Sequence, residues 1–132
     1  MLPELPAPGS PQDWLRNAQS DLALARLRRT RGMLYEHLCF HAQQAAEKAL
    51  KAVLLAHGVT FPRTHDLAFL VDQLPSAISI PPELIDLPTL SKYAVQNRYP
   101  GDTIPATAKH RVHAMRLAEH TVGWAKRLVA KT

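Results

Sequence analysis

The stretch CFHAQQAAEKALKAVLLAHG, residues 39–58, decides the fold of this chain. It carries Ala, Leu and Val at helical spacings of three and four, it contains no proline, and Gly58 supplies a stop at its end. An arc rich in alanine lets neighbouring helices approach closely, so we predict that residues 33–57 form the central helix of an all-α bundle. On a helical wheel the arc consists of Leu38, Ala42, Ala45, Ala49, Ala52, Val53 and Ala56.

Helical patterns also lie on both sides of this central stretch. We predict helices over residues 13–30, from residue 64 to about 74, over 83–99 and over 103–130. Thr64 and Thr103 are the expected N-caps of two of them, and Pro88 should make the first turn of the 83–99 helix irregular. No strand-like alternation is present, so the sequence predicts an antiparallel up-and-down bundle of four long helices plus one short helix.

The chain divides into a lead-in and one domain. Residues 1–12 contain four prolines and read as a flexible, Pro-rich lead-in, whereas residues 13–132 read as a single helical domain. The 46% hydrophobic and 20% charged content is that of a globular protein. No apolar run is long enough to cross a bilayer and no secretory signal pattern stands at the start, so we expect a cytoplasmic protein without a membrane partner.

The net charge of +5 is compatible with nucleic acid, a nucleotide or an acidic protein as partner, and equally with an ordinary basic surface. No metal or cofactor motif is present. His110 and His113 are three residues apart, and we expect a surface pair rather than metal ligands. Cys39 lies within the central helical pattern, which indicates a packing role.

A polar stripe on the central helix is the first candidate for a functional site. His41, Gln44 and Lys48 project side by side on the wheel and offer an imidazole, an amide and an ammonium. These groups suit a phosphate or an RNA backbone. The same stripe could instead be a solvated face or a dimer seam.

A second group of candidates follows the 83–99 pattern. Arg98 can make a bidentate phosphate contact, and Tyr93 or Tyr99 can offer a ring on which a base stacks. In the alternative interpretation these three side chains only anchor the end of their helix. We expect His65 to tie down the loop at a helix start rather than to act in catalysis.

Three stretches together resemble the HEPN domain family (higher eukaryotes and prokaryotes nucleotide-binding). They are CFHAQQAAEKALKAVLLAHGV at 39–59, THDLAFLVDQL at 64–74 and YAVQNRYPGD at 93–102, preceded by a pattern of Trp14, Asp21, Leu22 and Ala25. The resemblance covers about residues 13–130. It implies a bundle of four or five helices, a homodimer, and a minimal nucleotidyltransferase as partner, often in a toxin–antitoxin module.

Many members of the family resembled are metal-independent ribonucleases that use an Arg, a polar residue and then a His a few residues on. Here Tyr99 follows Arg98 and the next histidine is His110, while Arg116 and His120 stand one helical turn apart. The resemblance therefore implies a dimeric nucleotide- or RNA-associated component of such a module. The alternative is a ribonuclease with an atypical site at Arg98, Arg116 or His120.

Overall fold

The structure, a computed structural model, describes residues 4–94 and 105–132. Three long helices form its frame: α1 (Pro11–Ala25), α2 (Tyr35–Ala56) and α4 (Ala108–Ala130). Between α2 and α4 lie the short helix α3 (Leu67–Asp72) and two 3-10 helices, η1 (Pro82–Leu84) and η2 (Leu87–Tyr93). No strand occurs in these two ranges, and the predicted all-α class is confirmed.

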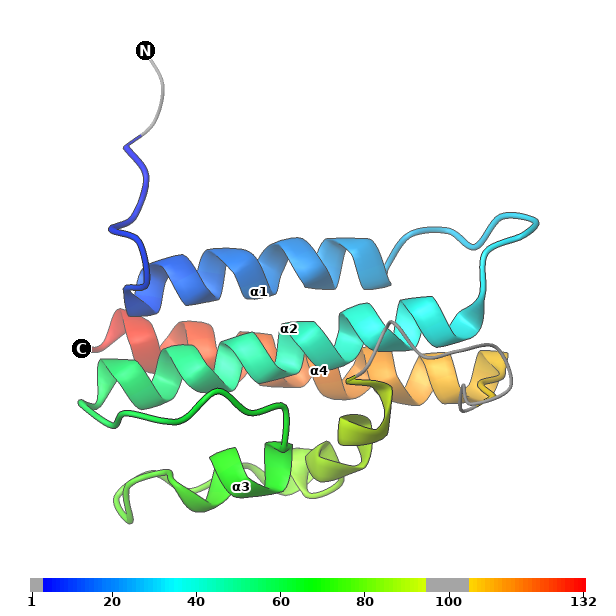
Figure 1. Cartoon of the computed structure of the whole chain (residues 1–132). Coiled ribbons are helices and arrows are strands. Elements are labelled where there is room, and N and C mark those ends of the chain that lie inside the picture. Colours follow the sequence, from blue (N-terminus) through cyan, green and yellow to red (C-terminus); the bar gives the residue numbers. More distant parts are fainter. Residues whose placement is uncertain (1–3, 95–104) are drawn as a thin grey trace.

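The chain runs up and down along one axis (Figure 1). Helix α2 returns antiparallel to α1, the chain then travels back through α3, η1 and η2, and α4 runs beside α2 in the same direction. None of the helices in the described part of the chain has the length and hydropathy needed to cross a membrane.

Helix α2 is the centre of the core, as predicted. It packs along both α1 and α4, and its alanines Ala42, Ala45 and Ala49 have no exposed surface. Buried alanines on all three long helices let the backbones approach closely. The apolar core is completed by Leu84, Leu87 and Leu90 of the 3-10 segments, which are also fully buried.

The predicted long helix over 83–99 is wrong for its described part. Residues 82–93 form two 3-10 helices with hydrogen bonds from residue i+3 to residue i, such as Leu84 N–H to Pro81 O at 2.9 Å. Pro88 explains the difference, because it stands inside the predicted helix, where proline has no N–H to donate and its ring clashes with the preceding turn. The described part of the chain therefore has three long helices instead of four, and residues 95–99 lie outside it.

Helix α1 starts two residues earlier than predicted and ends five residues earlier. Ser10 is its N-cap, with its hydroxyl oxygen accepting from the Asp13 N–H, and the helix stops at Ala25. The guanidinium of Arg111 on α4 donates to the backbone oxygens of Ala25, at 2.8 Å, and of Leu27. These bonds satisfy carbonyls that a longer helix would have used itself, so the end of α1 is fixed by a residue far along the chain.

The caps of α3 and α4 also lie further along the chain than predicted. Asp66, not Thr64, caps α3, with its carboxylate accepting from the Phe69 N–H at 3.2 Å. Thr107 caps α4 in a reciprocal pair with His110, whereas the expected cap Thr103 lies outside the described residues. In each helix, a side-chain oxygen nearer the first turn accepts the capping hydrogen bond.

Candidate functional site

A buried polar row runs along one side of α2. Gln43, Glu47 and Lys51 are spaced by four residues and have exposed fractions of 0%, 3% and 5%. The Glu47 carboxylate accepts from Gln43 Nε2 at 2.9 Å and from Lys51 Nζ at 3.0 Å. A buried charge needs such partners, so this row is a built feature of the fold.

The same row holds the loop that follows α2. The Nδ1 atom of His65 lies 2.8 Å from Glu47 Oε1, and Lys51 Nζ donates to the backbone oxygen of Thr64 at 2.9 Å. Residues 64 and 65 are therefore fixed against α2, and His65 ties down the loop as expected from the sequence. The imidazole itself stays outside, since 61% of its side chain is exposed.

A second carboxylate organises the predicted polar stripe of α2. Asp21 on α1 accepts from Lys48 Nζ at 2.7 Å, and its other oxygen lies 3.2 Å from His41 Nδ1. His41 and Lys48 thus lie close together, as predicted, because both contact the Asp21 carboxylate of α1. Gln44 turns aside and donates to Gln43 Oε1 at 2.6 Å.

Of the second group of candidates, Tyr93, Arg98 and Tyr99, only Tyr93 lies within the described residues. Tyr93 is only 7% exposed, so its ring offers no face on which a base can stack. Burial raises the pKa of the Tyr93 hydroxyl to about 12 and that of the neighbouring Cys39 thiol to about 11. Arg98 and Tyr99 lie outside the described residues.

Beside Lys48 and Lys51 the surface opens into a groove of about 550 Å³, here called the Trp14 groove. Its aromatic walls are Trp14 of α1 and Phe61 of the loop, whose ring centroids are 6.0 Å apart and nearly perpendicular. The ammonium of Lys51 lies 5.4 Å from each ring centroid. The full lining is Trp14, Glu47, Lys48, Lys51, Phe61, Pro62, Arg63, Thr64 and His65.

The lining of the Trp14 groove contains more cations than carboxylates. It holds Lys48, Lys51, Arg63 and one carboxylate, Glu47, which pairs with Lys51, while Lys48 pairs with Asp21 outside the lining. Within the described residues, two of the three ammonium protons of Lys51 have an acceptor, and Arg63 is exposed at the rim. Aromatic walls beside spare cationic donors suit an anion that carries a ring.

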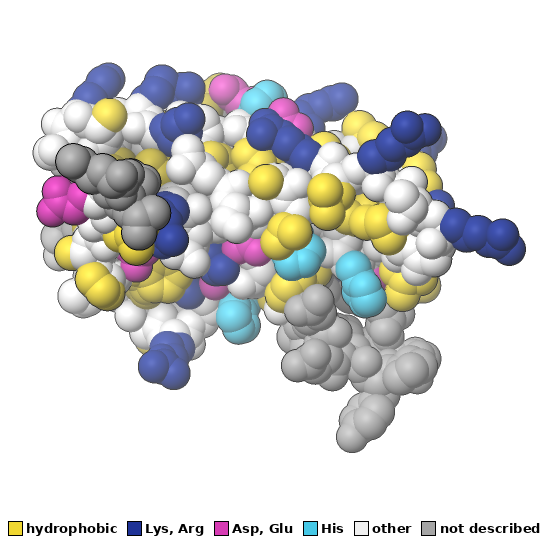
Figure 2. Space-filling model, turned by 90° about the horizontal axis from the view of Figure 1, so that it is seen from above, with side chains coloured by type: hydrophobic (Ala, Val, Ile, Leu, Met, Phe, Trp, Pro, Cys, Tyr) yellow, Lys and Arg dark blue, Asp and Glu magenta, His cyan; other side chains and the backbone are white. Residues whose placement is uncertain are grey.

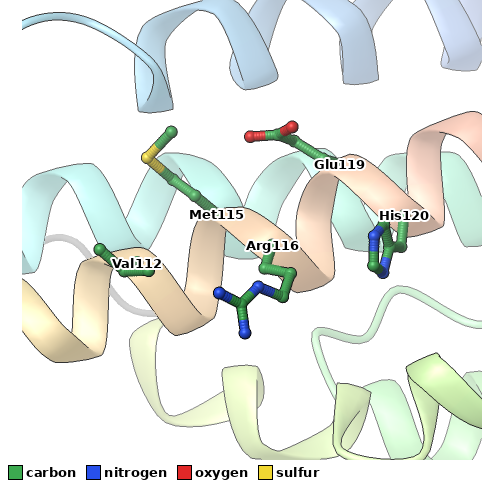
Figure 3. A pocket seen from close by; sticks show the side chains of 5 residues that line it. All are labelled: Val112, Met115, Arg116, Glu119 and His120. Atoms are coloured by element: carbon green, nitrogen blue, oxygen red, sulfur yellow. The ribbon is translucent and has the colours of Figure 1, made fainter.

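A separate hollow of about 350 Å³ lies on α4 and is lined by Val112, Met115, Arg116, Glu119 and His120. Figure 3 shows Arg116 and His120 projecting from the same side of the helix, while Met115 and Glu119 reach towards α1. Glu119 pairs with Arg26, the residue that follows α1, at 3.4 Å. The alternative catalytic pair is therefore exposed and lies near a carboxylate.

No group of three or more His, Cys, Asp or Glu side chains suited to a metal occurs in residues 4–94 and 105–132. His110 caps its own helix, and His113 lies 3.9 Å from Asp86. The two histidines thus have separate local partners.

Sequence reasoning missed the contribution of Asp21, Trp14 and Phe61. These residues reach the site only because α1, α2 and the loop converge. Trp14 and Asp21 are seven residues apart on α1, but no helical period connects them to α2 or to Phe61. Trp14, Asp21 and His65 did belong to the motifs that carried the family resemblance, which was the one available signal.

Comparisons with known proteins agree with this architecture. The HEPN domain model matches residues 11–129. The crystal structure of ST0689, an archaeal HEPN homologue, superposes with a TM-score of 0.68 at 27% identity and covers 91% of this chain and 98% of its own. The crystal structure of TT1696 from Thermus thermophilus gives a TM-score of 0.58 at 34% identity over 91% of this chain and 93% of its own. No curated protein matches. The match over nearly the whole bundle shows that the chain belongs to the HEPN domain family.

Proposed function

We propose that this HEPN protein is a nucleotide- or RNA-binding module, and that its ligand lies in the Trp14 groove. The observation that carries the proposal is the meeting of two aromatic rings with three cations in one opening of about 550 Å³. A cavity of this size is in the range that holds a small ligand. The rings can contact a base and the cations a phosphate.

The Trp14 groove is preorganised, which supports binding rather than incidental charge. Lys51 is held by Glu47 and Thr64, and Lys48 by Asp21, so neither ammonium has to be ordered when a ligand arrives. Arg63 remains exposed at the rim and is the side chain that a ligand would recruit.

The experiment is equilibrium binding of mononucleotides and of a labelled single-stranded RNA, compared between wild type, Arg63→Ala and Arg28→Ala. Both variants remove one exposed cation, but Arg28 lies at the far end of α1 from the Trp14 groove. We expect Arg63→Ala to weaken binding about tenfold, the loss of one charged hydrogen bond, and Arg28→Ala to leave it nearly unchanged. Equal losses of affinity in the two variants would mean that only the net charge of the protein matters, which would contradict a site in the Trp14 groove. An absence of binding would overturn the proposal.

We further propose that the module is a homodimer and that it partners a minimal nucleotidyltransferase, as in toxin–antitoxin pairs. Support comes from apolar surface: Val112 is 55% exposed on α4 and Leu27 is 49% exposed after α1. Figure 2, which looks down on α1, shows apolar side chains between the cations of this face. Surface of this kind is typical of protein–protein contact.

Ribonuclease activity is the second candidate function, and the α4 hollow favours it. Arg116 can stabilise a charged phosphorane and His120 can transfer a proton, and both line that hollow with Glu119. The same RNA incubated in EDTA should be cleaved by wild type and spared by His120→Ala if this site is active. Intact RNA at high protein concentration would leave binding as the function.

A further inference from the structure

A second hollow adjoins the Trp14 groove and shares two of its residues. It has a volume of about 280 Å³, and Gly9, Asp13, Trp14, Asn17 and Lys48 line it. Trp14 and Lys48 belong to both openings, so they form the ridge between them. We call the second opening the Asp13 hollow.

The two openings differ in their chemistry. The Trp14 groove presents cations, whereas the polar side chains of the Asp13 hollow, apart from the shared Lys48, are an aspartate and an asparagine. A ligand that fills both needs an anionic part on one side of Trp14 and a part with hydrogen-bond donors on the other. A nucleotide has this division between its phosphate and its base.

The hydrogen bonds inside the Asp13 hollow determine what it offers. The amide nitrogen of Asn17 donates to the backbone oxygen of Asp13 at 2.9 Å and lies 3.4 Å from Asp13 Oδ1. Its protons are thus turned towards Asp13, which leaves Asn17 Oδ1 as the atom to meet a ligand. Asp13 Oδ1 also pairs with Arg16 Nη1 at 3.4 Å, whereas Asp13 Oδ2 accepts from the Gly9 N–H at 2.9 Å and can take a second bond.

The Asp13 hollow therefore presents acceptors, and a base with adjacent donors fits them. Guanine offers N1–H and an N2 amino group side by side, a pair that two acceptors, Asp13 Oδ2 and Asn17 Oδ1, can accept together. Adenine and cytosine offer one amino group each, and uracil presents carbonyl oxygens around its single N–H. The uracil oxygens would face the oxygens of the Asp13 hollow without a hydrogen bond, and this lowers the affinity for uracil.

We infer that the chain binds a guanine nucleotide across the Trp14 ridge, with the base in the Asp13 hollow on the indole and the phosphate at Lys48 and Arg63. The guanine nucleotide is free or part of an RNA strand, since both present the same base and phosphate. This inference rests on the proposed function and adds the identity of the base.

The test is calorimetric titration of wild type with GMP, AMP, CMP and UMP, repeated for Asp13→Asn and Asn17→Ala. We expect wild type to prefer GMP to UMP by about tenfold, the value of one or two discriminating hydrogen bonds. Asp13→Asn should abolish most of that preference, because its amide loses an acceptor for guanine and gains a donor for the uracil oxygens. Asn17→Ala, an exposed position, should reduce the preference without affecting the cap of α1.

Ser20→Ala serves as the control, because it is an exposed change on the same helix away from both openings. Titrations with the hexamers UUUUUU and UUGUUU separate the two sources of the base. A gain for UUGUUU supports an RNA ligand, and a preference confined to GMP supports the free nucleotide.

The outcomes separate this inference from the proposed function. Equal affinity of wild type for GMP and UMP, with both weakened by Arg63→Ala, would overturn guanine recognition and leave the Trp14 groove as a nucleotide site. Undetectable binding of every mononucleotide and of both hexamers would overturn both.

Discussion

The thiol of Cys39 and the hydroxyl of Tyr93 are neighbours inside the core, and both resist ionisation. Burial is the larger cause for each: it raises the pKa of Cys39 from 9.0 to about 11 and that of Tyr93 from 10.0 to about 12. A neutral, buried thiol is a poor nucleophile, so Cys39 has the packing role that its helical position indicated.

These shifts predict a loss of stability at alkaline pH. Above pH 9 the unfolded chain loses the Cys39 proton while the folded chain keeps it, so the free energy of unfolding falls as the pH rises from 9 to about 11. The thiol alone accounts for a decrease on the order of 2 kcal/mol. Urea unfolding at several pH values should show a shallower decrease for Cys39→Ala than for wild type. Parallel decreases in the two proteins would contradict the assignment.

Also at the residue scale, the helical wheel predicts that His41 and Lys48 lie side by side, but it does not predict Asp21, the carboxylate that binds both. Asp21 precedes them by 20 and 27 residues and lies on another helix. Periodicity describes one element, whereas an ion pair between helices depends on how the elements pack. Lys51 is the opposite case, because its partner Glu47 lies four residues before it on the same helix.

At the scale of the elements, the limit of sequence reasoning lies in the segment 82–93. The apolar spacing of Leu84, Leu87 and Leu90 is correct for burial and fits a helix, but the local prolines impose 3-10 geometry. The long helices were predicted to within a few residues, because each presents a sustained apolar face. Their ends were missed where a distant residue, such as Arg111, satisfies the last carbonyls.

The close approach of the helices predicts that alanine on α4 is intolerant of larger side chains. Ala118 is fully buried, so Ala118→Leu should lower the free energy of unfolding by about 1–3 kcal/mol through overpacking. Ala130→Leu makes the same change at an exposed position of the same helix and should alter stability by less than about 0.5 kcal/mol. Chemical denaturation of the two variants is the measurement. Equal changes in the free energy of unfolding would show that the packing around Ala118 can accommodate a larger side chain.

At the scale of the whole molecule, the exposed apolar surface of α4 is the feature that predicts an assembly. We predict a dimer through the α4 hollow, because Val112 is exposed there beside Met115, and Arg116 and Glu119 on one copy can pair with Glu119 and Arg116 on another. Light scattering should give about twice the chain mass of 14.7 kDa for wild type and the single mass for Val112→Arg.

Ile85→Arg is the matched control, because Ile85 is 77% exposed between the two 3-10 helices and lies outside the hollow. It should remain dimeric. A monomeric wild type, or dissociation by Ile85→Arg alone, would place the interface elsewhere or remove it.

The position of α4 also governs how the protein is made. A nascent chain that has emerged up to Thr107 contains α1 and α2, but the alanine face of α2 that α4 covers is still open to water. At roughly 5–20 residues per second, the ribosome needs about 1–5 s to add α4. During that interval the uncovered face of α2 is open to chaperones and proteases, and the core closes only when α4 packs against it.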